Sequence, residues 1–439
     1  MATDTGAMKV ANRWGIVVAA IVMQLALGAV YAWSVFVVPL EKANAADKWS
    51  DTQVTLTFTI AIAVLGIGAA IGGFWLDRVG PRIVGTTAAI CYGLGVFLAG
   101  FSTHSLPLMY LSYGVLGGLG MGLGYIVPVA TLVKWFPDRR GLVTGLAVCG
   151  FGGGAVLTAP IASSLITSQG VGTTFIILGI VYLVMVLVAA QFYRNPPAGY
   201  VPAGWTPSAK QTAQRAARDF TPSQALSRGQ WYVLWAILAL NVTAGIAIIS
   251  QAKPLALDAL GVPLTTKDVA SLALATTFVS LIGVFNASGR FLWAWLSDLI
   301  GRRQVFMSMF ALQIVLFVLL AIVVNAHSYA LLITLGFIVA LCYGGGFGTM
   351  PAFAADYFGP KKAGSIYGVM LTAWSAGGVL GPLLFAQVKD RTGGYVGGFI
   401  VIAVLMAASF FLPFLVRPPR AQAEPEVAAI GGVQPQAGD

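Results

Sequence analysis

The run LIGVFNASGRFLWAWLSD, residues 281–298, is apolar over most of its length and carries Arg290 near its middle. Arg290 precedes Asp298 by eight residues, so its Cα lies about 12 Å from that acidic end if the run is helical. An ionisable side chain this deep in a membrane span usually serves a function, because burying its charge in hydrocarbon is costly. The run therefore predicts an anion-binding arginine, provided that the chain is a membrane protein.

The composition of the whole chain supports a membrane protein. Of its 439 residues, 58% are hydrophobic and 9% are charged, whereas a soluble domain carries about 25% charged residues. Apolar runs of about 20 residues recur along the chain, as in polytopic helical membrane proteins. The net charge of +10 comes from short Lys and Arg clusters between these runs, which is typical of cytoplasmic loops. We exclude a soluble enzyme and expect no nucleic-acid partner.

The hydropathy pattern predicts an all-α polytopic membrane protein with twelve transmembrane helices. We place them near residues 14–40, 53–76, 83–103, 106–134, 141–166, 171–193, 230–256, 266–297, 303–325, 328–354, 363–387 and 394–416. The first run is too long for the apolar region of a cleavable signal peptide. We expect two pseudo-symmetric six-helix bundles, at 1–193 and 230–416, with a cytoplasmic central loop at 194–229 and a disordered cytoplasmic tail at 417–439.

The basic residues set the expected orientation. Eighteen Lys and Arg residues fall on one side of the predicted spans and six on the other, which with Arg290 make up the 25 in the chain. Because Lys and Arg concentrate in cytoplasmic loops, both termini are expected in the cytoplasm. We predict a multi-pass protein of the inner (plasma) membrane, in which the acidic residues occupy loops, tails and span ends and Arg290 is the one deep charge.

Two loop motifs recur in the second half of the chain. The sequence DRVGPR at 77–82 is echoed by DLIGRR at 298–303, and WFPDRR at 135–140 is echoed by YFGPKK at 357–362. The spacings are 221 and 222 residues. Two homologous six-helix halves are the architecture of a rocker-type secondary transporter, whose substrate binds between the halves near the midplane.

The first motif resembles the major facilitator superfamily signature G-x-x-x-D-R-x-G-x-R-R, which it matches from Gly73 to Arg82, with Ile83 in place of the last arginine. We interpret the repeated loops as a gate, in which an acid at a helix end pairs with basic residues and helix dipoles and holds the halves in one state. Simple anchoring by positive charge would explain the basic residues but not the Asp–Gly spacing. The predicted gating residues are Asp77, Arg78, Arg82, Asp298, Arg302, Arg303, Arg139 and Arg140.

Residues 135–154, WFPDRRGLVTGLAVCGFGGG, resemble the span-five signature of the monocarboxylate transporter family. Taken together, the resemblances cover nearly the whole chain and include oxalate/formate antiporter-like proteins. In that family an arginine in span eight binds the substrate carboxylate, and Arg290 occupies the matching position. A guanidinium suits this role, because it stays protonated and offers a planar fork to a carboxylate. The alternative, snorkelling to the inner surface, would require a reach of about 12 Å.

Two positions depart from the relatives. Asn286 stands where mammalian-type monocarboxylate transporters carry an aspartate implicated in proton coupling, although its amide could still bind substrate. Trp374 stands where the oxalate antiporter has a lysine that clamps a second carboxylate. With one cation, a dicarboxylate would leave its second charge uncompensated in a low dielectric. We therefore expect a small monocarboxylate such as lactate, pyruvate or formate, with a proton or a counter-anion as the coupled species.

The other predicted site residues are aromatic or polar side chains of spans that line the cavity in this superfamily: Tyr31, Tyr125, Asn241 and Tyr343. Tyr125 and Tyr343 are preferred because each lies beside a glycine run, and Trp374 is expected to act as a size filter. Packing is the alternative role for each aromatic residue. The three cysteines show no metal-ligand spacing, so we predict no metal and no cofactor.

The sequence thus predicts a secondary active transporter of small monocarboxylates that works by alternating access and functions as a monomer. We rank proton symport first, because the nearest family resemblance favours it. Anion exchange of the oxalate/formate type is the alternative, which the lack of a deep acid favours. A non-transporting membrane sensor is less favoured, because both tails are short.

Overall fold

The computed structural model describes residues 13–44, 47, 49–197, 199–202, 204–206, 219–263, 268–326 and 328–417. Within these ranges the regular structure is entirely helical. The first half contains α1 (Arg13–Leu27), η1 (Gly28–Ala32), α2 (Ser34–Ala43), α3 (Asp51–Val79), α4 (Pro81–Ala99), α5 (Leu106–Met109), the π-helix η2 (Tyr110–Gly117), α6 (Gly118–Trp135), α7 (Arg140–Gln169) and α8 (Val171–Gln191).

The second half contains α10 (Pro222–Leu226), α11 (Gly229–Ser250), α12 (Ala252–Ala259), α13 (Val269–Ile300), α14 (Arg302–Val323), η3 (Val324–Ala326), α15 (Tyr329–Phe358), α16 (Ala363–Met370), α17 (Thr372–Thr392), α18 (Tyr395–Phe410) and α19 (Leu412–Leu415). The expected tail lies outside the described residues from position 418 onward, as do residues 207–218 of the expected central loop.

Eleven helical segments in the described part of the chain are long and apolar enough to cross a membrane. The expected eighth span is not among them, but it corresponds to α13, a helix of 32 residues. The predicted all-α membrane fold is confirmed, with α13 as a further long helix that carries Arg290. The expected span at 14–40 is interrupted by the 3₁₀ helix η1, which begins where Gly28 lies against the backbone of Phe151.

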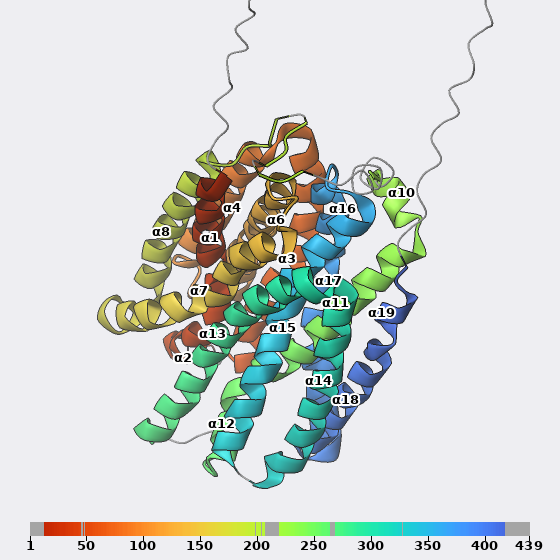
Figure 1. Cartoon of the computed structure of the whole chain (residues 1–439). Helices are drawn as coiled ribbons and strands as arrows, with labels where there is room; N and C mark the ends of the chain where they lie inside the picture. The colour runs from red at the N-terminus through yellow and green to blue at the C-terminus, as the bar shows by residue number, and fades with distance from the viewer. Residues whose placement is uncertain are drawn as a thin grey trace, which may run out of the picture.

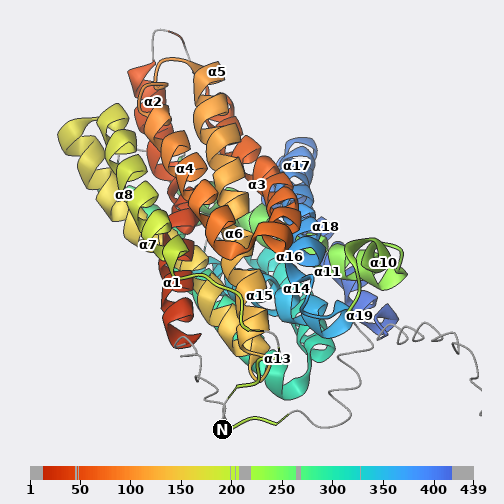
Figure 2. The ribbon, with the colours of Figure 1, turned by 90° about the horizontal axis from the view of Figure 1, so that it is seen from above.

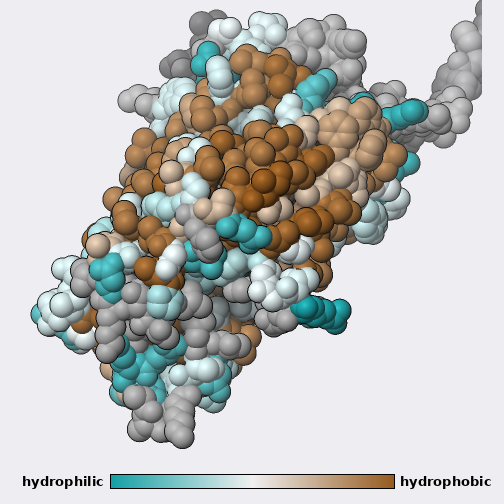
Figure 3. Space-filling model, turned by 90° about the horizontal axis from the view of Figure 1, so that it is seen from below, coloured by the Kyte–Doolittle hydropathy of each residue, from teal (hydrophilic) through white to brown (hydrophobic). Residues whose placement is uncertain are grey.

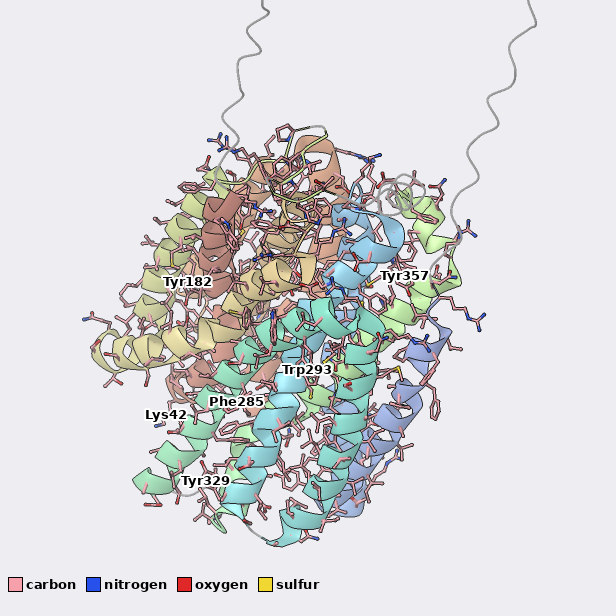
Figure 4. All side chains as sticks on the ribbon, in the orientation of Figure 1. Lys42, Tyr182, Phe285, Trp293, Tyr329 and Tyr357 are labelled. Atoms are coloured by element: carbon pink, nitrogen blue, oxygen red, sulfur yellow. The ribbon has the colours of Figure 1, made fainter. Side chains whose placement is uncertain are left out.

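The outer surface is apolar, as a protein in contact with lipid requires. Large aliphatic side chains are exposed on helices of both halves, for example Ile67, Val188, Ile322 and Val404. Brown, hydrophobic residues cover much of the face seen in Figure 3. Figure 4 shows Tyr329 and Tyr357 near the two ends of α15, where each hydroxyl donates a hydrogen bond to a backbone carbonyl. Tyrosines at both ends of a helix are typical of the two membrane interfaces.

The chain forms two helical halves that lie beside each other. In Figures 1 and 2 the first half is coloured red to yellow and the second half green to blue. The halves meet where α7 packs on α13 and where α3 packs on α16 and α17. Glycines permit close contact along both seams: Gly145 lies against Ala294 and the backbone of Arg290, and Gly73 lies against the backbone of Gly364.

The two repeated Asp–Gly loops have the same backbone geometry. Gly80 follows α3 with φ 87°, and Gly301 follows α13 with φ 98°. A positive φ is strained for residues with a Cβ, so glycine suits the tight connection to α4 and α14. Asp77 and Asp298 therefore lie in the last turn of their helices. We call the face that carries these helix ends, together with the starts of α7 and α16, the gate face.

Candidate functional site

Arg290 lies in α13, ten residues before the end of the helix at Ile300 and at the seam between the two halves, and its side chain is completely buried. Its Nε donates to Asn286 Oδ1 at 3.1 Å, and its Nη1 donates to the backbone carbonyl of Val148 in α7 at 3.3 Å. Within the described ranges, Nη2 has no hydrogen-bond partner and no acidic residue forms a salt bridge with the guanidinium. A buried positive charge is therefore held in place and remains available to an anion.

Aromatic rings from both halves enclose the guanidinium. The Arg290 Cζ lies 5.4 Å from the ring centre of Phe151 in α7 and 4.7 Å from that of Phe347 in α15. Trp374 of α17 is fully buried, and its ring lies 5.2 Å from Tyr125, 5.2 Å from Phe151 and 4.5 Å from Phe347. Cation–π contacts favour the charge in this setting, while the rings leave little room for a large ligand.

Tyrosine hydroxyls surround the same position. The hydroxyls of Tyr31 and Tyr343 are 2.9 Å apart and join the two halves by a hydrogen bond. In the described structure, the buried hydroxyls of Tyr125 and Tyr367 and the Trp374 indole nitrogen have no hydrogen-bond partner. Both of these hydroxyls lie near enough to Arg290 to interact with its charge. Buried polar groups normally find partners, so these atoms mark a place for a small polar ligand or water.

The structure thus brings together six of the seven predicted binding residues, namely Arg290, Asn286, Tyr31, Tyr125, Tyr343 and Trp374. Asn241 takes a different place in α11. Its Nδ2 donates to the carbonyls of Cys342 and Tyr343 at 3.4 and 3.3 Å, and its Oδ1 accepts from Gln313 at 3.1 Å. Both polar atoms of its side chain are engaged inside the second half, so Asn241 supports the backbone beside Tyr343.

Three residues of the site were missing from the sequence prediction: Phe151, Phe347 and Tyr367. Phe347 lies 222 residues after Tyr125, which is the spacing of the repeated WFPDRR and YFGPKK motifs. The repeat could therefore have identified it. Phe151 carries no comparable signal, because apolar rings are common in every span.

At the gate face, one acid of each half accepts hydrogen bonds from the start of a helix in the other half. Asp77 Oδ2 accepts from the Ser365 backbone N–H at 2.9 Å and from its Oγ at 2.6 Å, in α16. Asp298 accepts from the N–H groups of Gly141 at 3.2 Å and Leu142 at 2.8 Å, in α7. A carboxylate is favoured there by the partial positive charge of a helix N-terminus.

Ion pairs extend these contacts but differ between the two sides of the gate. Lys134 Nζ lies 3.3 Å from Asp77 within the first half. The residue 222 positions after Lys134 is Asp356, and it binds Arg140 across the interface at 2.8 Å and Arg302 within its own half at 3.1 Å. The repeated positions thus carry opposite charges, and the gate is symmetric in backbone but not in charge. In the sequence, Asp356 is one of several acidic residues at span ends, and no motif marks it.

The eight predicted gating residues fall into two groups. Asp77, Asp298 and Arg140 contact the opposite half, and Arg302 binds Asp298 at 2.6 Å. The others lie away from these contacts: Arg82 donates to Gln191 in the same half, Arg303 lies over the Phe414 ring, and Arg78 and Arg139 are exposed.

The halves are closed together at the gate face. Close packing of α7 on α13 runs from Gly141 beside Asp298 to Val156 beside Gly283. Beyond that point the two helices separate, and their far ends lie apart in Figure 1. Arg290 therefore lies behind closely packed helices on the side of the gate face.

Two helical halves with a buried arginine between them, joined by polar contacts at one face, have the architecture of a membrane transporter. The chain belongs to the Major Facilitator Superfamily, whose sequence profile matches residues 6–382 and 262–434. It is 27% identical to the oxalate:formate antiporter of Oxalobacter formigenes over 93% of this chain and 92% of the relative.

It is also 26% identical to monocarboxylate transporter 13 of Rattus norvegicus over 90% of this chain and 86% of that protein. Among solved structures, the proton:xylose symporter XylE superposes with a TM-score of 0.73 at 15% identity, covering 92% of this chain and 96% of that chain. At that identity the likeness concerns the fold. The resemblance noted from the sequence motifs is confirmed by these relatives.

Proposed function

We propose that this protein carries small monocarboxylates across the plasma membrane by alternating access, with Arg290 as the residue that binds the carboxylate. The observation that carries the proposal is a fully buried guanidinium that has a free Nη2 and, in the described structure, no acidic partner. Arginine binds carboxylates through charge-assisted hydrogen bonds. An anion at this position compensates a charge that is otherwise costly to bury.

The neighbours of Arg290 favour an anion with one charge. Its contacts are the amide of Asn286, a backbone carbonyl and aromatic rings, all of which are neutral. Trp374 fills the side of the site toward α17 and offers at most its indole N–H. Among the described residues, a second carboxylate would meet no second cation there. Lactate, pyruvate and formate fit this description, whereas oxalate does not.

The transport cycle follows from the contacts at the gate face, which we take to be the cytoplasmic face with both termini on the same side. In the conformation described, the anion enters from the opposite side and neutralises Arg290. Opening the gate then breaks the bonds from Asp77 to Ser365, from Asp298 to the start of α7 and from Arg140 to Asp356. A bound anion favours this exchange of states only if it binds the two states differently. A change in the hydrogen bond between Tyr31 and Tyr343, which joins the halves beside the site in this state, supplies such a difference.

Two modes of coupling are open to this site. Proton symport is the mode that the resemblance to monocarboxylate transporters favours. Anion exchange is the second candidate, and the composition of the site favours it: in the described structure, the groups around Arg290 are an amide, a carbonyl, two phenyl rings and tyrosine hydroxyls. Such groups do not exchange protons near neutral pH.

Uptake of radiolabelled L-lactate into proteoliposomes tests the proposal. We expect saturable uptake that formate and pyruvate inhibit and oxalate inhibits poorly. Stimulation by an inward proton gradient in empty vesicles supports symport, whereas uptake that requires an anion inside supports exchange. Absence of uptake under both conditions would contradict monocarboxylate transport.

A further inference from the structure

The start of α7 is a carboxylate-binding position that the chain fills with its own acids. The backbone N–H groups of Gly141 and Leu142 donate to Asp298, and Arg140 Nη1 donates to Asp356 Oδ1 at 2.8 Å. Both acids belong to the opposite half. The residue before the helix, Arg139, provides no side-chain cap, so the capping group of this 30-residue helix is the carboxylate of Asp298.

Arg140 has more donors than these acids use. Its side chain is only 9% exposed. Among the described residues, its Nε and Nη2 have no hydrogen-bond partner. A buried guanidinium with two unpaired nitrogens is costly in this state, and a state that supplies partners for them is favoured relative to it. The position thus combines two helix N–H groups, a buried cation and spare donors.

Opening of the gate separates this position from its acids. Asp298 and Asp356 belong to α13 and α15, so they remain with the second half, where both bind Arg302, at 2.6 and 3.1 Å. Arg140 and the start of α7 move with the first half and lose both carboxylates. The second half then has two acids on one guanidinium, while in the first half Arg140 and the N–H groups of Gly141 and Leu142 have lost the carboxylates that they bind here.

We propose that, in the gate-open state, the start of α7 binds a free small carboxylate from the gate side in place of Asp298 and Asp356. Val148, whose carbonyl contacts Arg290, lies eight residues after Arg140 in α7, so this station is about 12 Å from the central one along the helix. The inference rests on the proposed function and adds a second anion site to it. A carboxylate on the gate side then competes with the gate acids and stabilises the open state by mass action.

The test uses the purified full-length chain with Arg290→Ala in every variant, so that the central site is silent. In one variant, Asp356→Asn removes the ion pair with Arg140, which loosens the gate and leaves Arg140 available. In the other, Asp356→Asn is combined with Arg140→Gln, which loosens the gate equally but removes the cation of the proposed site. The unfolding temperature is followed by tryptophan fluorescence with sodium lactate or with sodium chloride at the same ionic strength. A variant with Arg140→Lys keeps the charge and is expected to respond more weakly than arginine.

We expect a saturable rise in unfolding temperature with lactate, but not with chloride, in the variant that keeps Arg140, and none in the variant with Arg140→Gln. Equal rises in both variants, equal rises with chloride, or no rise in either would overturn the proposal. The outcome is independent of the central site, because every variant carries Arg290→Ala. Lactate uptake is measured separately with the unmodified protein. If that uptake is absent while the Arg140-dependent rise is present, the proposed transport function fails and the gate site stands.

Discussion

Gly145 lies where α7 and α13 come closest, and a single methyl group there should open the gate. A Cβ at this position would lie 2.5 Å from the Ala294 Cβ and 2.6 Å from the Arg290 carbonyl oxygen. A Cβ atom and a backbone oxygen cannot rotate away, so Gly145→Ala cannot be accommodated by a local side-chain shift. Both atoms also belong to the other half. The two halves must separate along the seam, which disfavours the gate-closed state described here.

The expected size of the effect follows from the clash. Ordinary contacts between carbon atoms lie at about 3.5–4.0 Å, so the seam must widen by roughly 1 Å. Overpacking of this kind costs about 1–3 kcal/mol. At 1.4 kcal/mol for each factor of ten, the ratio of gate-closed to gate-open protein should fall by about 5- to 150-fold. The apparent KM for lactate added on the far side should rise, because only the gate-closed fraction binds it.

Gly153→Ala is the matched control, because a Cβ there would lie 3.8 Å from Leu25 and 3.9 Å from Ala287, which are ordinary contacts. Gate opening is read from the alkylation rate of Ala363→Cys in protein whose three native cysteines are replaced. Ala363 is 6% exposed and lies at the start of α16. We expect faster alkylation and a higher apparent KM with Gly145→Ala and no change with Gly153→Ala. Unchanged alkylation and uptake in Gly145→Ala protein of normal thermal stability would refute the assigned gate geometry.

Of three further predictions, two concern the site and one concerns a helix cap. Trp374→Lys should favour oxalate over lactate as an inhibitor of residual uptake by roughly tenfold or more, because a charge-assisted hydrogen bond contributes about 1.5–3 kcal/mol; an unchanged inhibition ratio would argue against a single-charge site. Tyr125→Phe should raise the KM for lactate by about tenfold if the hydroxyl binds substrate, whereas an unchanged KM would assign the ring to packing. Hydrogen bonds from Ser271 hold the pKa of Asp268, at the start of α13, below its usual value. Asp268→Ala should therefore lower the unfolding temperature by its full amount above a pH of roughly 4, and this difference from the unmodified chain should disappear as the pH falls further. A difference in unfolding temperature that does not depend on pH would contradict this prediction.

The architecture could be predicted because the residues that define it stand out in the sequence itself. Long apolar runs, a loop motif repeated after 221 residues and a lone deep arginine are each visible in the sequence. The predicted binding residues that converge on Arg290 share a second property, since they are polar or aromatic groups in runs that are otherwise aliphatic.

The remaining contacts depend on how each helix is rotated, which uniformly apolar helices do not encode in a simple pattern. Asn241 was expected at the site, yet its amide binds backbone carbonyls of α15 and the side chain of Gln313. Asp356 is not distinguished in the sequence, because it is one of several acidic residues at span ends and its counterpart in the repeat, Lys134, carries the opposite charge. Its role became visible only through Arg140 and Arg302, which lie 216 and 54 residues away in sequence.

Lactate uptake by Arg290→Lys protein, reconstituted beside the unmodified chain, tests the central claim most directly. Lysine keeps the charge, but its single nitrogen cannot reproduce the guanidinium contacts to Asn286, Val148 and a carboxylate together. Loss of one charge-assisted hydrogen bond, at about 1.5–3 kcal/mol, predicts that uptake efficiency falls by roughly 10- to 150-fold, and Arg290→Ala should abolish uptake while both proteins remain folded. Uptake by folded Arg290→Ala protein at the rate of the unmodified chain would contradict the assignment of Arg290 as the carboxylate site.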